Sequence, residues 1–155
     1  MLTYLIKINK YNTWANDLLI HNLRSQEITD ESVLKLLSHI VLSESIWMMR
    51  LKSEDYSNKN FWKVLSITEC NRLSQENSKK YSDYLKEKLD NDLERLVTYK
   101  NSKGIEYSNS IEDILTHIYS HSGYHRGQIA KEVRKLDKEP AYTDYIEFIR
   151  TSFQK

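Results

Sequence analysis

Apolar residues recur at helical spacing along most of the chain. In the first segment they form one stripe, made by Tyr4, Ile8, Tyr11, Ala15 and Leu18, with Leu5 and Leu19 beside it. A spacing of three to four residues is that of an amphipathic helix, and the segment contains no Gly or Pro. The pattern therefore predicts a first helix over about residues 3–23.

A second stripe predicts a helix over residues 31–51, with Thr29 or Asp30 as its N-cap. Its apolar members are Val33, Leu37, Ile40, Trp47 and Leu51, with Leu36 alongside. Two polar residues interrupt this pattern. Glu44 falls inside the stripe, where an apolar residue is expected, and His39 lies about 100° from the centre of the stripe.

The rest of the pattern predicts a loop over 52–65 anchored by Phe61 and Trp62, a third helix from 66 or 68 to about 89, a β-hairpin over 96–108, a fourth long helix over about 110–135 and a short helix over 142–153. The hairpin is indicated by alternating apolar residues on either side of a Gly-containing turn. We therefore predict an all-α fold, a four-helix bundle with a small hairpin before its last long helix and a short C-terminal helix. One domain covers 1–155.

Composition narrows the function classes. The chain has 155 residues with only 3 Gly and 1 Pro, and its 23 basic residues are balanced by 22 acidic ones. A nucleic-acid partner is not expected, because phosphate binding needs a basic excess. No apolar run exceeds four residues, so no membrane span is expected. There is no signal-peptide pattern at the N-terminus, and Cys70 is the single cysteine, which fits a cytoplasmic location.

The histidines provide the candidate chemistry. His117, His121 and His125 follow one another at four-residue spacing, which places their side chains within about 80° of arc on a helix. Two imidazoles one turn apart can bind one divalent cation, with a further ligand from a facing helix. His39 is the candidate for that ligand, whereas we interpret His21 as a solvated surface residue.

Three segments resemble the DinB/YfiT-like family of helical-bundle metalloenzymes. Residues 124–128, Tyr-His-Arg-Gly-Gln, are similar to the signature helix of that family, and residues 39–51 resemble its second motif. Residues 11–16 resemble its first-helix pattern, and the hairpin occupies the position at which such proteins carry one. The resemblance spans nearly the whole chain.

The resemblance implies a four-helix bundle with a divalent metal ion held by His39, His121 and His125. It implies nickel or zinc, with iron or manganese as alternatives, and a homodimer. The family includes thiol-dependent S-transferases and isomerases, which implies a small-molecule substrate and a low-molecular-weight thiol as co-substrate. His117 is then a pocket residue or a support for a ligand.

Other residues near the predicted ligands have expected roles. Glu44 either pairs with Arg126 across helices or reaches solvent, and Gln128 is placed to hydrogen-bond a ligand imidazole or the substrate. Gly127 is expected to allow close helix packing. Trp14 and Trp47 are assigned to the core, and Cys70 is expected to be a structural thiol.

Three protein ligands leave the metal with open positions, which is typical of a catalytic site. A bound thiol would attack an electrophilic carbon, whereas a bound water would hydrolyse a substrate, and the sequence does not decide between them. One alternative is a metal-binding bundle without activity, with a regulatory or stress-associated role. Another is a helical interaction module in which the histidines are incidental.

Overall fold

The computed structural model describes residues 1–153. Its elements are, in order, α1 (Leu2–Ser25), α2 (Glu31–Leu51), α3 (Ile67–Lys86), the 3₁₀ helix η1 (Asp90–Glu94), β1 (Leu96–Lys100), β2 (Glu106–Ser110), α4 (Ile111–Lys135) and α5 (Tyr145–Phe153). The predicted fold class is confirmed. Four long helices form a bundle, an antiparallel hairpin precedes the last of them, and a short helix follows.

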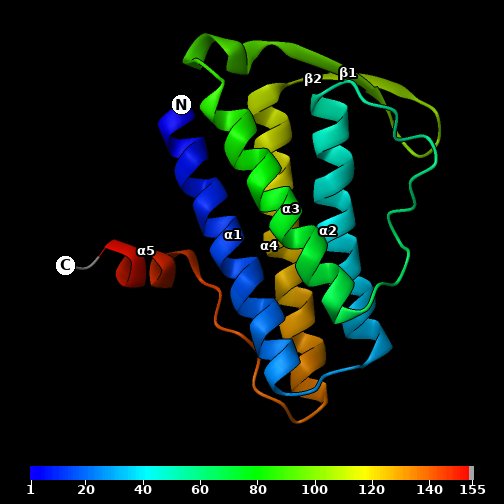
Figure 1. The fold of residues 1–155 in the computed structure, drawn as a ribbon, viewed down its shortest axis with the longest axis vertical. Helices are drawn as coiled ribbons and strands as arrows, with labels where there is room; N and C mark the ends of the chain where they lie inside the picture. The colour runs from blue at the N-terminus through cyan, green and yellow to red at the C-terminus, as the bar shows by residue number, and fades with distance from the viewer. Residues whose placement is uncertain (154–155) are drawn as a thin grey trace.

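The four long helices do not simply alternate in direction. α2 and α3 run the same way, and α1 and α4 run opposite to them, so the long segment 52–66 must travel back along the bundle (Figure 1). Both α1 and α2 pack against α3 and α4. One face of α2 therefore lies along α4, which brings together the two helices that carry His39 and the later histidines.

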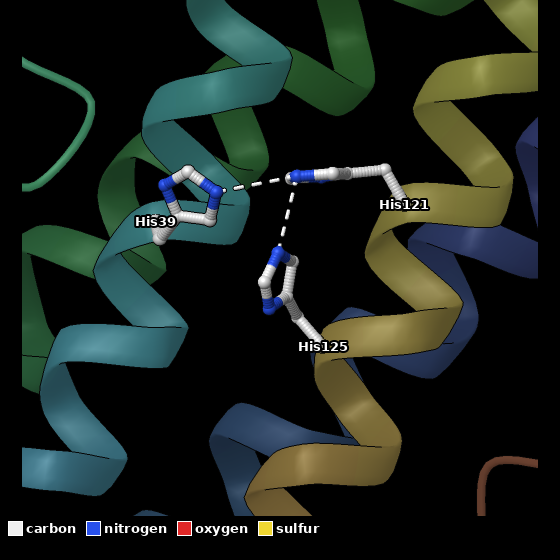
Figure 2. A group of neighbouring side chains, drawn as sticks. All are labelled: His39, His121 and His125. Carbon is white, nitrogen blue, oxygen red and sulfur yellow. Dashed lines mark hydrogen bonds between the residues drawn. The ribbon is translucent and has the colours of Figure 1, made fainter.

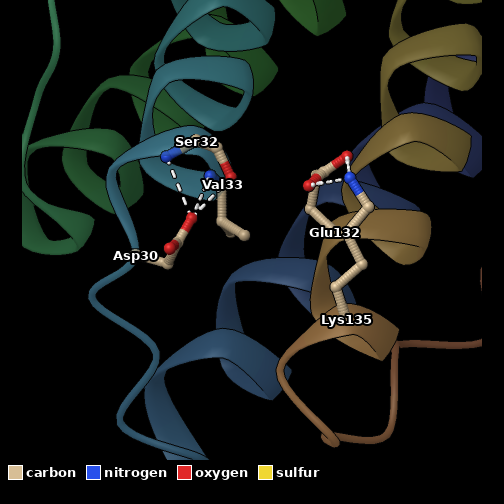
Figure 3. A network of polar contacts seen from close by, with 5 residues as sticks. All are labelled: Asp30, Ser32, Val33, Glu132 and Lys135. Carbon is tan, nitrogen blue, oxygen red and sulfur yellow. Dashed lines mark hydrogen bonds and ion pairs between the residues drawn. The ribbon is translucent and has the colours of Figure 1, made fainter.

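Helix ends follow the predicted capping residues. Of the two candidates before α2, Asp30 is the cap, and its carboxylate accepts hydrogen bonds from the backbone N–H of Ser32 and Val33 at 3.0 and 3.2 Å (Figure 3). Hydrogen bonds from Ser32 and Val33, with the positive charge of Lys135, hold the pKa of Asp30 below its usual value. Ser110 caps α4, where it accepts from the backbone N–H of Asp113. These caps fix where the two site-bearing helices begin.

Three element boundaries differ from the predicted ones. α3 ends at Lys86 rather than near 89, and a 3₁₀ turn follows because the side chain of Leu93 is fully buried against the bundle. β2 continues to Ser110, so the hairpin leads directly into α4. α5 begins at Tyr145, three residues later than predicted.

The predicted apolar face of α1 is confirmed in part: Leu5, Ala15 and Leu19 are buried, but the buried face is rotated away from the predicted stripe towards three asparagines. Tyr4 is 57% exposed, whereas Asn9, Asn12 and Asn16 are buried in the bundle. The asparagines face inward because two of them hydrogen-bond charged groups of other helices. The predicted core positions of α4, in contrast, are buried as expected: Ile111, Leu115, Ile118, Ile129 and Val133.

One described helix, Glu31–Leu51, is long and apolar enough to cross a membrane by length and composition alone. The expectation from apolar runs did not anticipate this. In the structure 56% of the relevant window is buried inside the bundle, and the helix also buries Glu44 and Arg50. Burial on several faces accounts for the apolar character of this helix.

Candidate metal centre

Three imidazole rings converge between α2 and α4. His39 projects from α2, and His121 and His125 project from successive turns of α4 (Figure 2). The Nε2 atom of His121 lies 3.2 Å from Nε2 of His39 and 3.1 Å from Nε2 of His125. The candidate ligand atoms of all three residues lie within 4.8 Å of one another. The structure thus brings the three predicted ligands to one point.

Hydrogen bonds on the far side of two rings determine which nitrogen carries the proton. Nδ1 of His39 lies 2.9 Å from the carbonyl oxygen of Phe61, and Nδ1 of His125 lies 2.7 Å from Oε1 of Gln128. The Gln128 amide nitrogen donates to the Tyr124 hydroxyl at 3.1 Å, which leaves its oxygen facing His125. Because a carbonyl oxygen only accepts, each Nδ1 is the donor, and each Nε2 presents a lone pair.

The lone pairs at the centre do not satisfy one another. Nε2 of His121 faces the lone pairs of both His39 and His125, and one N–H can be donated to only one of them. A cation removes this conflict. Nitrogen ligands bound at ~2.0–2.1 Å in tetrahedral or octahedral geometry are separated by about 2.9–3.4 Å. The observed separations of 3.1 and 3.2 Å fit such an arrangement.

The surroundings of His39 and His121 favour the neutral imidazole, which is the form that binds a metal. Burial lowers the pKa of His39, opposed by its hydrogen bond to Phe61. Burial, with the neighbouring His125, His39 and His117, lowers the pKa of His121 to about 3. Neither His39 nor His121 therefore has to lose a charging proton near neutral pH before a cation can bind.

The loop between α2 and α3 covers one side of the centre. The Trp62 ring stacks on the His39 ring, with centroids 3.8 Å apart and planes inclined by 6°. Trp62 is 50% exposed, yet through this contact and the Phe61 carbonyl the two residues anchor the loop, as predicted, on His39. The same contacts hold the His39 ring in one orientation.

An open cleft of about 550 Å³ leads to His39 and His121, between this loop and the tip of the hairpin. His117 also lines the cleft, but it is not part of the convergent cluster, since its ring centroid lies 5.5 Å from that of His121. Trp47 lines the cleft too and packs edge-on against His117. The assignment of Trp47 to the core is confirmed only in part, because Trp47 is partly buried against the core and against Tyr99 but also lines this cleft.

A second polar cluster lies behind the histidines. One carboxylate oxygen of Glu44, which is 4% exposed, accepts hydrogen bonds from Asn12, Asn16 and Ser122 at 2.8–2.9 Å. The amide oxygens of both asparagines accept from Nη1 of Arg126 at 2.8 Å. Glu44 and Arg126 are thus joined through two amides rather than by the direct ion pair that the sequence analysis considered.

The remaining predicted residues lie outside the centre. Gly127 is exposed, and a Cβ built there would meet no atom within 4 Å. The prediction that Gly127 permits close helix packing is therefore wrong. Cys70 is buried 3.6 Å from the hydroxyl of Ser38, and burial raises the pKa of its thiol. His21 is exposed on α1, and Trp14 packs against Phe148 of α5.

Sequence reasoning missed several residues that build the site. Asn12, Asn16 and Ser122 position the two helices, and Phe61 orients His39 through its backbone. A signal existed for the asparagines, since a carboxylate inside an apolar stripe needs buried donors. No local pattern identifies a carbonyl contributed by a loop.

The fold and the site together define a class of protein: helical bundles in which two facing helices direct three histidines to one point. Comparison with known proteins agrees, because the DinB family profile matches residues 1–155. The chain belongs to the DinB family. It is 26% identical to Protein DinB of Bacillus subtilis (strain 168), over 94% of this chain and 93% of that protein. It is 24% identical to the uncharacterized protein YizA of the same organism, over 89% and 86% of the two chains.

Proposed function

We propose that this protein binds one divalent metal ion through His39, His121 and His125 and is a metal-dependent enzyme. It transfers a low-molecular-weight thiol to an electrophilic small molecule, or it hydrolyses a small substrate. The observation that carries the proposal is the convergence of three Nε2 atoms with at least one lone pair left without a proton. Nickel or zinc is the proposed metal, with iron or manganese as alternatives.

A divalent cation with open coordination positions lowers the pKa of a thiol or water bound to it. The side chains around the centre have supporting tasks. Phe61 and Gln128 hold two rings in the ligand tautomer, and the cleft admits a small molecule beside His121. His117 lines the same cleft, and its lowered pKa, caused by burial and by Arg50, keeps its imidazole available as a proton acceptor.

Metal content is the first test of the proposal. Protein purified without an affinity tag is expected to contain about one divalent ion per chain by elemental analysis, and His121→Ala is expected to lose it. His21→Ala is the matched control, because it removes an exposed histidine of α1. A folded protein that takes up no nickel or zinc on titration would contradict the proposal.

Turnover is the second test. The metal-loaded protein is incubated with thiols and electrophiles, and with ester and amide substrates, and products are identified by mass spectrometry. Conjugation that is absent from His121→Ala supports thiol transfer, and hydrolysis absent from the same variant supports the second reaction. Metal binding without either product would support the alternative, a metal-binding bundle without activity.

A homodimer and a cytoplasmic location complete the proposal. The homodimer rests on the resemblance of the chain to its family, and the location rests on the single cysteine, Cys70. Sedimentation at several protein concentrations tests the first, since a dimer has twice the mass of the 18.5 kDa chain. Fractionation of the cells that produce the protein tests the second.

A further inference from the structure

Arg50 is a buried cation without a carboxylate partner. It lies near the end of α2 and is 5% exposed. Its Nη2 donates to the carbonyl oxygen of Lys100 at 3.1 Å, whereas its Nε has no hydrogen-bond partner. Within the described part of the chain, no ion pair joins Arg50 to an acidic residue.

Aromatic rings surround the guanidinium. Its carbon lies 4.4–5.5 Å from the ring centroids of Trp47, Tyr99, Tyr56 and Phe61, in order of increasing distance. Cation–π contacts offset part of the cost of burying the charge. They supply no anion, however, and a buried cation without one is unfavourable. Burial lowers the pKa of Arg50, which is the direction expected for such a group.

The position of Arg50 relates this cation to the metal centre. Arg50 lines the same cleft as His39 and His121, and Lys59 lines it as well. The hydroxyl of Ser43, also on this cleft and 3% exposed, has no hydrogen-bond partner. Among the described residues no acidic side chain lines this cleft, whereas Asp55 lines the adjoining cavity that Arg50 and Lys59 also border. The cleft therefore offers the histidine cluster in one part, and the buried cation of Arg50 with the exposed Lys59 and the buried hydroxyl of Ser43 in another.

We propose that Arg50 binds an anionic oxygen group, a carboxylate or a phosphate, of the small molecule whose reacting end reaches the histidine centre. Arginine recognises both groups through paired N–H donors. The exposed Lys59 adds positive charge, and Ser43 lines the same cleft with a buried hydroxyl that has no partner. This inference rests on the proposed function and deepens it, because it names the chemical class of the substrate or thiol.

A purely structural role for Arg50 makes a different prediction. Its aromatic contacts and its bond to Lys100 join α2 to the 52–65 loop and to β1. If that were its whole role, Arg50→Met would weaken all ligands alike or only lower the melting temperature. Selective loss of anionic ligands separates the two roles.

The first experiment needs no metal. The metal-free protein is titrated with inorganic phosphate and with succinate at constant ionic strength, and binding is followed by tryptophan fluorescence, since Trp47 lies against Arg50. We expect saturable binding of at least one anion, weakened about tenfold or more in Arg50→Met and partly restored in Arg50→Lys. Arg72→Met, which removes an exposed arginine of α3, is the matched control. Binding of neither anion would overturn the inference.

The second experiment uses the cobalt-loaded protein, in which thiolate binding produces a charge-transfer absorption. Glutathione carries carboxylates, coenzyme A carries phosphates, and 2-mercaptoethanol carries neither. Arg50→Met is expected to weaken at least one anionic thiol about tenfold or more and to change 2-mercaptoethanol less than twofold. Loss for glutathione alone identifies a carboxylate, and loss for coenzyme A alone identifies a phosphate. Equal loss for all three thiols would overturn the inference.

Further outcomes separate this inference from the proposed function. Failure to bind cobalt contradicts the metal centre, while the metal-free titrations still test Arg50. If Arg50→Met does not fold, the salt dependence of thiol binding to the unaltered cobalt-loaded protein tests the inference instead. Added NaCl should then weaken the anionic thiols much more than 2-mercaptoethanol, and equal weakening would overturn the inference.

Discussion

Two polar clusters involve both α2 and α4: one also includes asparagines of α1 around Glu44, and the other is formed by the histidines. One carboxylate oxygen of Glu44 accepts three hydrogen bonds. Two of the donors are asparagines, whose amide oxygens accept in turn from Arg126, so they bridge the two charged groups. Around His121, two neighbouring Nε2 atoms face a third. The first cluster contains its own positive charge and is enclosed, whereas the second could hold an added cation and borders a cleft. The difference separates a group that joins helices of the bundle from a group that is placed to bind a ligand.

The Glu44 cluster is not fully satisfied. Nε and Nη2 of Arg126 have no hydrogen-bond partner, and its guanidinium carbon lies 5.4 Å from the Tyr11 ring centroid. The hydrogen bonds of the Arg126 guanidinium are therefore all made by Nη1, and the Tyr11 ring is the aromatic group beside it. This makes the guanidinium dependent on the two asparagines, and through them on Glu44.

The largest expected effect is on stability. Glu44→Ala leaves the donors of Asn12, Asn16 and Ser122 without their acceptor and removes the carboxylate that balances the Arg126 charge through the asparagines. We therefore expect the free energy of unfolding to fall by about 3–5 kcal/mol, measured by urea denaturation. Adding Arg126→Met should cost less than the sum of the two single changes, because the groups act as one network. Additive losses would show that the asparagine bridge carries no coupling.

The histidine cluster should respond in the opposite way. His121→Ala removes a lone-pair conflict, so the metal-free variant is expected to be about as stable as the unaltered protein. Zinc at about 100-fold above its dissociation constant should stabilise the unaltered protein by about 2.7 kcal/mol and the variant by a negligible amount. Thermal denaturation with and without zinc measures both. Equal stabilisation of the two proteins would exclude His121 as a ligand.

An intermediate effect is expected at Gln128. Its amide oxygen accepts from Nδ1 of His125 at 2.7 Å, so Gln128→Ala should weaken metal binding about 10- to 100-fold. Gln128→Glu keeps an acceptor oxygen and is the matched control, with affinity retained or increased. Competition with a chelator of known affinity measures the change. An unchanged metal affinity in Gln128→Ala would show that this hydrogen bond does not affect metal binding.

The smallest expected effect is a pH dependence of the metal-free protein. The pKa of His121 is about 3 in the folded chain, whereas the ordinary histidine value, which applies to the unfolded chain, is 6.5. The unfolded chain therefore binds more protons between those two pH values. The free energy of unfolding therefore falls as the pH drops below 6.5. Between pH 7 and pH 5 this contributes about 1 kcal/mol after allowance for solvent screening.

A difference measurement isolates this contribution from other titrating groups. His121→Ala should lose less stability than the unaltered protein between pH 7 and pH 5, whereas His21→Ala should follow the unaltered protein, because His21 is exposed. Denaturant titrations at the two pH values compare the three proteins. Identical losses in all three would show that burial does not hold His121 neutral.

The helices and the shared face of His121 and His125 were accessible from sequence because both depend on local spacing. The N-cap at Asp30 and the stripe of Ile111 to Val133 were predicted and are present. The sequence did not show which face of α1 is buried, because its tyrosines and its asparagines both recur at the helical period. Burial of Asn12 and Asn16 becomes favourable only when Glu44 and Arg126 lie opposite them.

By itself, the sequence determined that His121 and His125 share one face of a helix, that His39 and Glu44 interrupt another, and that four long helices form. These properties follow from the 3.6-residue period, which relates only near neighbours along the chain. The tertiary structure alone decided that His117 stands apart, that Trp62 covers His39 and that Arg50 lines the same cleft. Those relations depend on how the 52–65 loop and the hairpin pack against helices that are remote from them in sequence. That packing is determined by the whole chain.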